Sequence, residues 1–231
     1  MTAKSHAKDK PQKAKMSLST EFVFVRHGQS HANSQNILQG QSESELDELG
    51  HRQARLLALR LQQQPPFDFI YSSDLKRAYD TAKHICGKNG GEIILSAELR
   101  EWNFGELQGR HRDELLRKYP DIMRSLYKTG DPVNIPGGES RDEMEQRCQG
   151  FIETLSRRHP GKRLLLVTHG GTLRAIFRRI VAPPGPDCLQ PNAANCSYSS
   201  CVFTAEQKWQ LTCWNDVSHL LSASADSEMK Y

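Results

Sequence analysis

Two histidines occupy equivalent places in the sequence, each directly after an apolar run typical of a buried strand. His27 follows FVFVR and His169 follows RLLLVT, and a glycine comes next in both cases. If the two strands are neighbours in a parallel sheet, the imidazoles face each other where the carboxyl ends of the strands meet, which is where such sheets bind ligands. Gly28 and Gly170 would let a ligand approach the backbone there.

Two arginines add fixed positive charge to the same edge. Arg26 directly precedes His27, and Arg77 falls in the first turn of a helix that follows the apolar run FDFIYSS. Gly170 and Gly171 lead into a further helix, whose free N–H groups point toward the same place. These groups would repel one another unless an anion bridges them. Phosphate suits them best, because its oxygens accept the bidentate hydrogen bonds of arginine.

These residue types could cleave a phosphomonoester. A neutral His27 imidazole could attack phosphorus, while the arginines and His169 spread the charge of the transferring phosphoryl group. A nearby carboxyl group would protonate the leaving oxygen and then activate the water that hydrolyses the phosphohistidine. Glu101, in the segment ELREWNFGELQG, is the candidate for this role. On position alone, a salt bridge to Arg100 or to another arginine explains Glu101 equally well.

The elements that must position these residues alternate between strand and helix patterns, which predicts an α/β fold. Asp47 and Ser140 are predicted N-caps of two helices, and a short helix is expected near Asp113–Tyr119. The runs SYSSCVFTA and KWQLTCW predict a late hairpin. The predicted fold is a three-layer α/β/α arrangement with a mainly parallel central sheet. A small cap, formed within 100–140, would cover the carboxyl edge of the strands.

Charge is unevenly distributed along the 231 residues. The chain has 31 basic and 27 acidic residues, and its first 16 residues hold five lysines against one aspartate, which leaves 26 of each sign in the remainder. A neutral body argues against a general nucleic-acid-binding face. We expect a disordered basic tail at 1–19, one domain at 20–218 and a flexible tail at 219–231.

The same composition bears on location and partners. No stretch approaches the roughly 18 apolar residues that cross a bilayer, and the start lacks an apolar secretory segment, so we expect a cytoplasmic protein without a membrane partner. The six cysteines lack zinc-ligand spacing and are expected to be mostly reduced packing thiols. The expected partner is a small phosphorylated substrate, and the chain could be a monomer or a dimer.

The motifs stand in the order of a known family. RHGQSHAN, SSDLKRAYDTA, LREWNFGELQG, PGGES and VTHGGTLRAI, between Val23 and Ile180, resemble the signatures of the histidine phosphatase superfamily. A single R-H-G tripeptide is weak, whereas five ordered motifs are strong. Gln29 stands where the family usually has glutamate, and Gln108 replaces a frequent acidic residue at the pocket rim, which bears on specificity.

The resemblance implies roles for individual residues. His27 would be the phosphorylated nucleophile and Glu101 the acid/base. Three residues would complete the phosphate pocket: Arg26, Arg77 and His169. Four would contact substrate: Asn33, Gln39, Gly40 and Gly170. The resemblance implies neither a metal nor an organic cofactor.

Hydrolysis is the preferred reaction. Glu101 and His169 are only 68 positions apart, whereas the mutase branch of the family carries a long insert that helps to keep water out. Phosphoglycerate mutase-type transfer and a non-catalytic phosphate-binding scaffold are the alternatives. Cap cations could select a second anionic group on substrate: His111, Arg112, Arg117, Lys118, Arg124 and Lys128. Fructose-2,6-bisphosphate, phosphoserine, ribazole phosphate and phosphotyrosine stay unranked as substrates.

Overall fold

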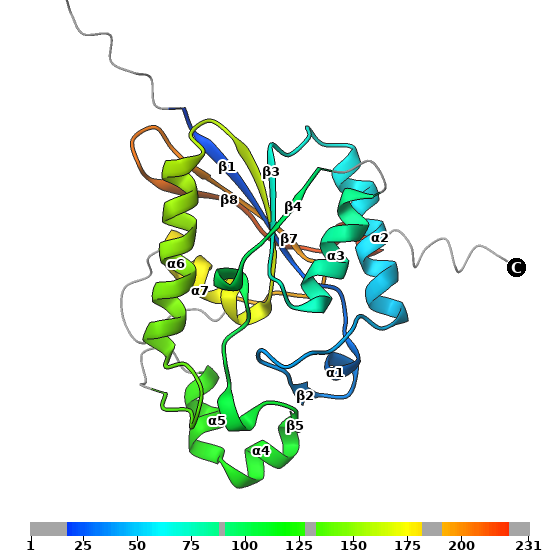
Figure 1. Cartoon of the computed structure of the whole chain (residues 1–231), viewed down its shortest axis with the longest axis vertical. Coiled ribbons are helices and arrows are strands. Elements are labelled where there is room, and N and C mark those ends of the chain that lie inside the picture. Colours follow the sequence, from blue (N-terminus) through cyan, green and yellow to red (C-terminus); the bar gives the residue numbers. More distant parts are fainter. Residues whose placement is uncertain (1–17, 88–90, 128–132, 182–190, 222–231) are drawn as a thin grey trace, which may run out of the picture.

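A six-stranded sheet in the order β4-β3-β6-β1-β7-β8 is the centre of the structure, a computed structural model that describes residues 18–87, 91–127, 133–181 and 191–221 (Figure 1). The strands are β1 (Thr20–Arg26), β3 (Phe69–Ser72), β4 (Ile93–Leu95), β6 (Arg163–Thr168), β7 (Tyr198–Phe203) and β8 (Trp209–Asp216). Only β7 runs antiparallel to its neighbours β1 and β8. The predicted mainly parallel sheet and the late hairpin are confirmed.

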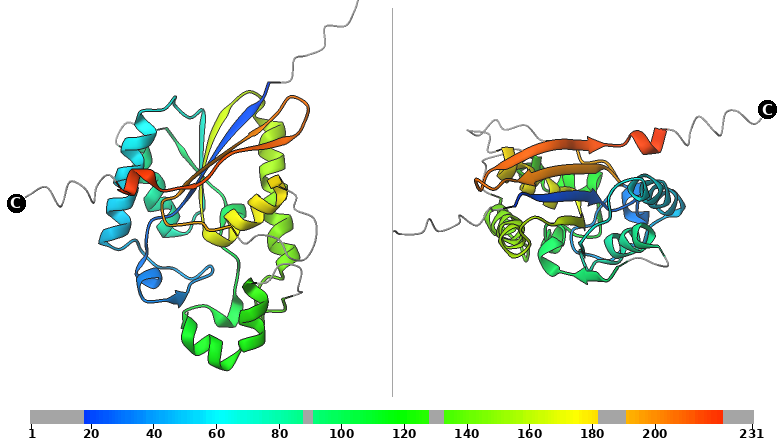
Figure 2. Two further views of the ribbon diagram at one scale, coloured as in Figure 1. Left: turned by 180° about the vertical axis from the view of Figure 1, so that it is seen from behind. Right: turned by 90° about the horizontal axis from the view of Figure 1, so that it is seen from above.

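Four helices cover the sheet: α2 (Glu48–Gln62), α3 (Lys76–Cys86), α6 (Arg141–Arg158) and α7 (Gly170–Val181). Alternate side chains of a strand point to opposite faces. Phe22 and Phe24 of β1 accordingly join the core formed with α6 and α7, whereas Val23 and Val25 join the core formed with α2 and α3. Figure 1 shows the two helix pairs on opposite sides, and Figure 2 shows β8 outermost at one edge. The three-layer α/β/α architecture is confirmed.

The predicted helix caps are present. The Asp47 side chain accepts a hydrogen bond from the Gly50 N–H at 2.8 Å. Ser140 forms a capping box with Glu143, in which each side chain accepts from the backbone of the other residue. Such caps satisfy N–H groups that the first turn of a helix leaves without partners.

The cap lies below the carboxyl ends of the strands in Figure 1. It contains α4 (Arg112–Lys118) and α5 (Pro120–Tyr127), next to the small sheet of β2 (Ile37–Leu38) and β5 (Arg110–His111). The helix predicted near Asp113–Tyr119 is α4. Helix α5 was not predicted; it begins at Pro120, and proline is well suited to the first helical position.

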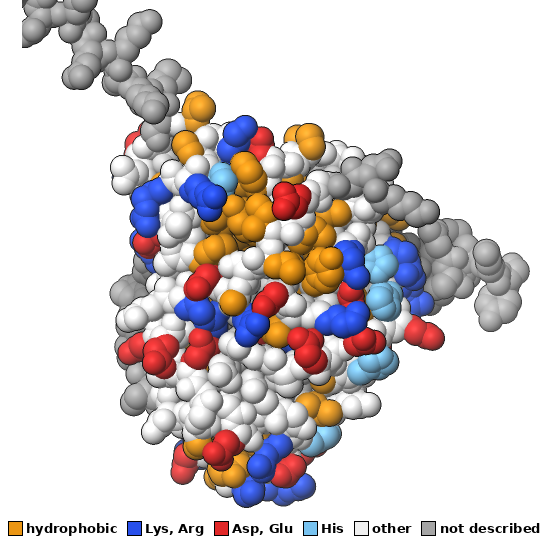
Figure 3. All heavy atoms as spheres, in the orientation of Figure 1, with side chains coloured by type: hydrophobic (Ala, Val, Ile, Leu, Met, Phe, Trp, Pro, Cys, Tyr) orange, Lys and Arg blue, Asp and Glu red, His pale blue; other side chains and the backbone are white. Residues whose placement is uncertain are grey.

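The predicted domain boundaries stay a prediction. After β8 the chain continues close to the body, with the His219 ring 3.2 Å from a guanidinium nitrogen of Arg60. Most of both predicted tails, the turn at 88–90, Cys188 and Lys128 lie outside the described residues. On the face in Figure 3, basic and acidic side chains are interspersed. No described helix has the length and apolar character needed to cross a membrane.

The backbone makes one very close approach between α2 and the segment after β1. A Cβ atom added at Gly28 would lie 2.6 Å from the Gly50 carbonyl oxygen, and one at Gly50 would lie 1.9 Å from the carbonyl oxygen of Gln29. Gly28 therefore makes room for α2. The prediction that it makes room for a ligand was wrong, because the sequence did not show which neighbour lies against this glycine.

We expect Gly50→Ala to lower the free energy of unfolding by about 1 to 3 kcal/mol, since the added methyl group would force the two backbones apart. Gly150→Ala in α6 is the matched control, because a Cβ there meets nothing within 4 Å. That change should stabilise the protein by about 0.5 to 1 kcal/mol through helix propensity. Urea unfolding of both variants measures the difference; equal stabilities would contradict the close-contact explanation.

Candidate active site

The two histidines that follow β1 and β6 lie side by side. The strands pair in parallel with Arg26 opposite Thr168, and the His27 N–H donates to the Thr168 carbonyl at 2.9 Å. The imidazole centroids of His27 and His169 are 5.0 Å apart, and the two residues are 2% and 0% exposed. The predicted juxtaposition is therefore present in a setting that is almost fully shielded from water.

His27 is held in one tautomer. Its Nδ1 lies 2.7 Å from the carbonyl oxygen of Gly28. A carbonyl only accepts hydrogen bonds, so Nδ1 carries the hydrogen and Nε2 has the free lone pair of a neutral ring. Burial, followed by the charges of Arg77 and Arg26, lowers the pKa of His27 well below its ordinary value. The ring is neutral at pH 7 and has a nitrogen available to act as a nucleophile.

His169 is oriented by two partners. The Arg77 Nε donates to its Nδ1 at 3.2 Å, and its Nε2 lies 2.8 Å from the Ser73 hydroxyl. Because a guanidinium only donates, Nδ1 is the acceptor and Nε2 carries the hydrogen. Burial and then Arg77 lower the pKa of His169 well below its ordinary value. The sequence analysis did not single out Ser73, although it lies in the SSDLKRAYDTA motif.

Arg77 is held by backbone carbonyl groups. Its guanidinium donates to Gly40 O at 2.6 Å and to Ser42 O at 2.9 Å, and the residue is 1% exposed. Gln39 is also buried, and its side-chain oxygen accepts from the Ser30 hydroxyl at 2.9 Å. Gly40 and Gln39 thus lie in the segment that supports Arg77, and neither lines the cavity that Arg26 and Glu101 share.

Arg26 has a side-chain N–H group that no described residue accepts a hydrogen bond from. One terminal nitrogen donates to Ala193 O at 2.5 Å, whereas Nε is buried and makes no hydrogen bond to any described residue. A Cβ added at Gly170 would lie 3.4 Å from this Nε, so the glycine keeps the guanidinium accessible. Burial lowers the pKa of Arg26 and of Arg77 to about 10 in each case. Both guanidiniums are therefore charged at neutral pH.

A cavity of about 330 Å³ adjoins these groups. Two of the predicted substrate contacts, Asn33 and Gly170, line it together with Arg26 and Glu101. The remaining lining residues are Leu38, Trp102, Phe104, Arg112, Leu126, Arg141, Met144, Gly171, Arg174 and Arg178. Asn33 is steadied by Asn195, whose amide donates to its side-chain oxygen at 3.3 Å.

Glu101 is anchored at the start of α7. Its carboxylate accepts from the Trp102 N–H at 2.9 Å and from the Gly171 N–H at 3.0 Å. Arg100 forms its ion pair with Asp74 at 2.5 Å. A salt bridge to Arg100, the alternative role considered for Glu101, is therefore not present. Both oxygens of the Glu101 carboxylate thus accept a backbone hydrogen bond, and the residue lines the cavity.

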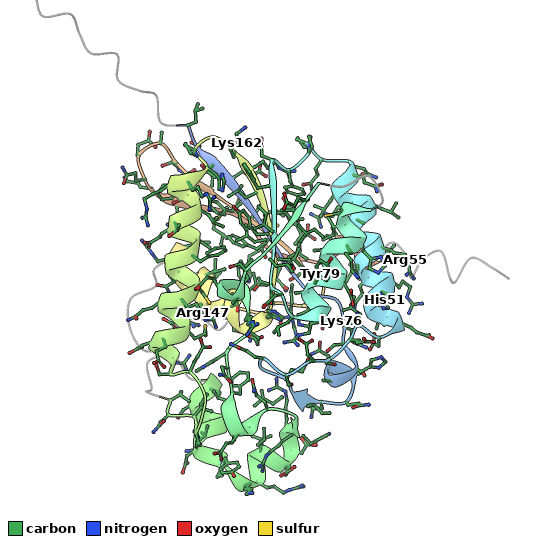
Figure 4. The ribbon with its side chains drawn as sticks, viewed as in Figure 1. His51, Arg55, Lys76, Tyr79, Arg147 and Lys162 are labelled. Carbon is green, nitrogen blue, oxygen red and sulfur yellow. The ribbon has the colours of Figure 1, made fainter. Side chains whose placement is uncertain are left out.

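Arg147 of α6 holds the segment that carries Glu101 in place. Figure 4 shows Arg147 beside this segment. It donates to the carbonyl oxygens of Glu98, Arg100 and Glu101 at 2.9, 3.1 and 3.3 Å. It also forms a two-point ion pair with Glu139, at 2.8 and 2.9 Å. The sequence analysis missed this residue, because an arginine in an amphipathic helix usually belongs to a solvated face.

Most of the cap cations singled out from the sequence do not reach the cavity. Arg112 lines it, while four others do not: His111, Arg117, Lys118 and Arg124. Gln108, expected at the pocket rim, instead accepts from the Gln41 N–H at 2.6 Å and ties two loops together. Three lining arginines were missed: Arg141, Arg174 and Arg178. The helical spacing of the last two, in the motif after His169, is the signal that could have found them.

The described part of the chain contains no cluster of three or more His, Cys, Asp or Glu side chains with the geometry of a metal site. The five described cysteines are free thiols. Burial raises the pKa of Cys148 to about 12.

The model of the histidine phosphatase superfamily (branch 1) matches residues 22–217. The chain belongs to this superfamily. A metal-independent phosphoserine phosphatase from Arabidopsis thaliana is 39% identical over 205 residues, which cover 88% of this chain and 84% of the relative. Phosphoglycerate mutase-like protein 4 from the same plant is 35% identical over 202 residues, which cover 87% and 86%.

A solved structure shows the same likeness. The mycobacterial glucosyl-3-phosphoglycerate phosphatase in complex with VO3 superimposes with a TM-score of 0.76 at 29% identity, covering 84% of this chain and 98% of that one. The match to the histidine phosphatase superfamily and the phosphatase names among the relatives support a phosphatase.

We expect this histidine phosphatase to lose stability as the pH falls from about 7 to about 5. Unfolded histidines bind protons near pH 6.5, whereas His27 and His169 stay neutral in the folded state because burial lowers their pKa. The unfolded state then binds more protons, so each histidine removes up to about 1.4 kcal/mol per pH unit, a slope approached only below the unfolded pKa of about 6.5. Urea unfolding at several pH values measures the slope. His27→Asn should reduce it, and an unchanged slope would contradict the assignment.

Proposed function

We propose that the protein hydrolyses small phosphorylated metabolites through a phosphohistidine on His27, with Glu101 as the acid/base and without a metal ion. One observation carries this proposal. The neutral, buried His27 imidazole is close enough to Arg77 and Arg26 for their charges to lower its pKa, and Arg26 lines a cavity together with Glu101. Nucleophile, phosphate-binding groups and proton donor therefore meet at one edge of the sheet.

Binding of the phosphate would use donors that the protein leaves available. The buried Nε of Arg26 is one of them. Each terminal nitrogen of Arg77 has a second N–H beyond the one it donates to a carbonyl oxygen. Such donors are already in place before the substrate arrives, and electrostatic stabilisation is largest for groups fixed in advance in a water-poor site.

In the first chemical step the lone pair of His27 Nε2 attacks phosphorus, and the bond between phosphorus and the leaving oxygen breaks. Glu101 in its protonated form gives its proton to that oxygen, so an alcohol departs. In the second step the Glu101 carboxylate takes a proton from water. The hydroxide attacks phosphorus and the P–N bond breaks. Inorganic phosphate is released and neutral His27 is restored.

The size of the cavity supports a small substrate. A volume of about 330 Å³ is at the lower end of the range for small-molecule pockets. The relatives named above act, by their names, on phosphoserine and on glucosyl-3-phosphoglycerate. We therefore place the substrate among phosphorylated metabolites of this size.

A second candidate function is phosphoryl transfer of the phosphoglycerate mutase type. Its support is the relative named phosphoglycerate mutase-like protein 4. A mutase must return the phosphoryl group to substrate before water reaches it, and the described part of the cap is built around two short helices, α4 and α5. Hydrolysis is therefore the preferred proposal.

We expect His27→Ala to abolish turnover of an aryl phosphate, because the proposed covalent intermediate forms on the His27 imidazole. Wild-type protein quenched during turnover should carry an acid-labile, base-stable phosphoryl label on His27. The matched control is His31→Ala, which changes an exposed histidine four positions away and should leave the rate unchanged. Rates and peptide mapping measure both outcomes.

Equal turnover by wild type and His27→Ala would contradict the phosphohistidine mechanism. A stable phosphoserine in place of the acid-labile label would also contradict it. With 3-phosphoglycerate as substrate, formation of the isomer faster than release of phosphate would favour the mutase candidate over hydrolysis.

Glu101→Gln should slow alkyl phosphomonoesters by about 100-fold or more, because their leaving oxygen needs a proton. The slowing should be smaller for p-nitrophenyl phosphate, whose leaving group departs readily as an anion. Comparing kcat for the two substrates tests the role of the carboxyl group. Glu106→Gln removes an exposed carboxylate five positions away and serves as the control. Equal slowing of both substrates by Glu101→Gln would refute proton donation.

A further inference from the structure

The cavity contains more positive charge than a single phosphoryl group requires. Its described lining includes one carboxylate, that of Glu101, and five guanidiniums: Arg26, Arg112, Arg141, Arg174 and Arg178. Arg26 lies beside His27 and belongs to the proposed phosphate-binding group. The remaining four come from the cap and from the ends of α6 and α7, where the rest of a substrate would lie.

Two of these arginines, one turn apart on α7, have different surroundings. Arg178 is paired with Glu145 of α6, with nitrogen to oxygen distances of 2.5 and 2.8 Å. The two side chains are 11% and 23% exposed. Because this partly buried pair neutralises the guanidinium, Arg178 has little charge to offer a ligand.

Arg174 has no such compensation. Its Nε donates to the carbonyl oxygen of Pro191 at 3.3 Å, and no carboxylate of a described residue forms an ion pair with it. Its positive charge is close enough to Arg26 to lower the pKa of that residue. Among the described residues, Arg174 is thus a cation at the wall of the cavity without an ion-pair partner.

Arg174 and Arg26 flank the same backbone position. A Cβ atom added at Gly170 would lie 3.4 Å from Nε of Arg26 and 3.7 Å from a terminal nitrogen of Arg174. A ligand with two anionic groups only a few bonds apart could meet both guanidiniums at once. Five apolar side chains line the same cavity and suit a short carbon skeleton: Leu38, Trp102, Phe104, Leu126 and Met144.

We propose that Arg174 binds a carboxylate on the substrate while Arg26 and Arg77 hold the reacting phosphate. The substrate class is then small phosphomonoesters that carry a carboxylate a few bonds from the phosphorus. The planar guanidinium matches a carboxylate through two parallel hydrogen bonds. This inference rests on the proposed hydrolysis at His27, and it adds Arg174 as a residue that determines specificity.

The test uses pairs of substrates in which one member carries the carboxylate and the other has a hydrogen or a hydroxymethyl group in its place. O-phosphoserine is compared with O-phosphoethanolamine, and 3-phosphoglycerate with glycerol 3-phosphate. Arg174→Met should lower kcat/KM for the carboxylate-bearing member of each pair by about 10- to 100-fold, the usual effect of a lost charged hydrogen bond. The other member should change much less. Arg178→Met is the matched control and should leave the ratio within each pair as in wild type.

An equal loss for both members of each pair in Arg174→Met would overturn the inference and assign Arg174 to the reacting phosphate. A ratio that shifts as much in Arg178→Met would also overturn it. Fructose 1,6-bisphosphate compared with fructose 6-phosphate adds a third pair. If Arg174→Met altered this pair alone, a second phosphate would be the ligand and the carboxylate would be excluded.

Two further measurements keep the result interpretable. Arg174→Lys keeps the charge but loses the planar two-point geometry, so it should give an intermediate ratio even if the methionine variant folds poorly. The phosphohistidine label formed from p-nitrophenyl phosphate should persist in both Arg174 variants. Loss of the label from wild type would refute the proposed function itself, whereas a retained label with an unchanged ratio refutes only the role of Arg174.

Discussion

Buried positive charge is the constraint on which the rest of the structure depends. Arg26 and Arg77 are charged at neutral pH although burial lowers the pKa of each to about 10, and the hydrogen bonds that hold them go mainly to neutral carbonyl groups. Glu101 is the carboxylate whose charge acts most strongly on both. Burying charge without full compensation is destabilising. An anion bound in this site would therefore stabilise the buried arginines.

The scaffold keeps these groups in place through backbone contacts. Parallel pairing of β1 with β6 sets the two imidazoles 5.0 Å apart, and the carbonyl of Gly28 fixes the tautomer of His27. Arg147 of α6 donates hydrogen bonds to three backbone carbonyl groups of the segment that carries Glu101. A site built on strand ends and clamped loops needs little rearrangement to bind phosphate, which is the condition for strong electrostatic stabilisation.

The molecule divides recognition between two regions. The carboxyl edge of the sheet supplies the groups proposed to bind and transfer the phosphoryl group, and these are the groups whose motifs the superfamily shares. The cap and α7 supply the lining residues proposed to contact the rest of the substrate. Of Arg174 and Arg178, one helical turn apart, the second is paired with Glu145, whereas the first donates to the Pro191 carbonyl oxygen. In the proposed specificity site, a carboxylate on a neighbouring helix thus distinguishes the two arginines.

The sequence by itself determined the α/β/α fold, because continuous apolar runs alternate with amphipathic helical patterns and N-caps mark the helix starts. It also determined that His27, His169, Arg26 and Arg77 meet, since parallel strands present their carboxyl ends at one edge. Only the tertiary structure decided what each glycine and each helical arginine does. Gly28 touches α2, Arg147 clamps a loop and Arg174 faces the cavity, because these roles depend on which elements pack together, and residue spacing within one helix carries no information about its neighbours.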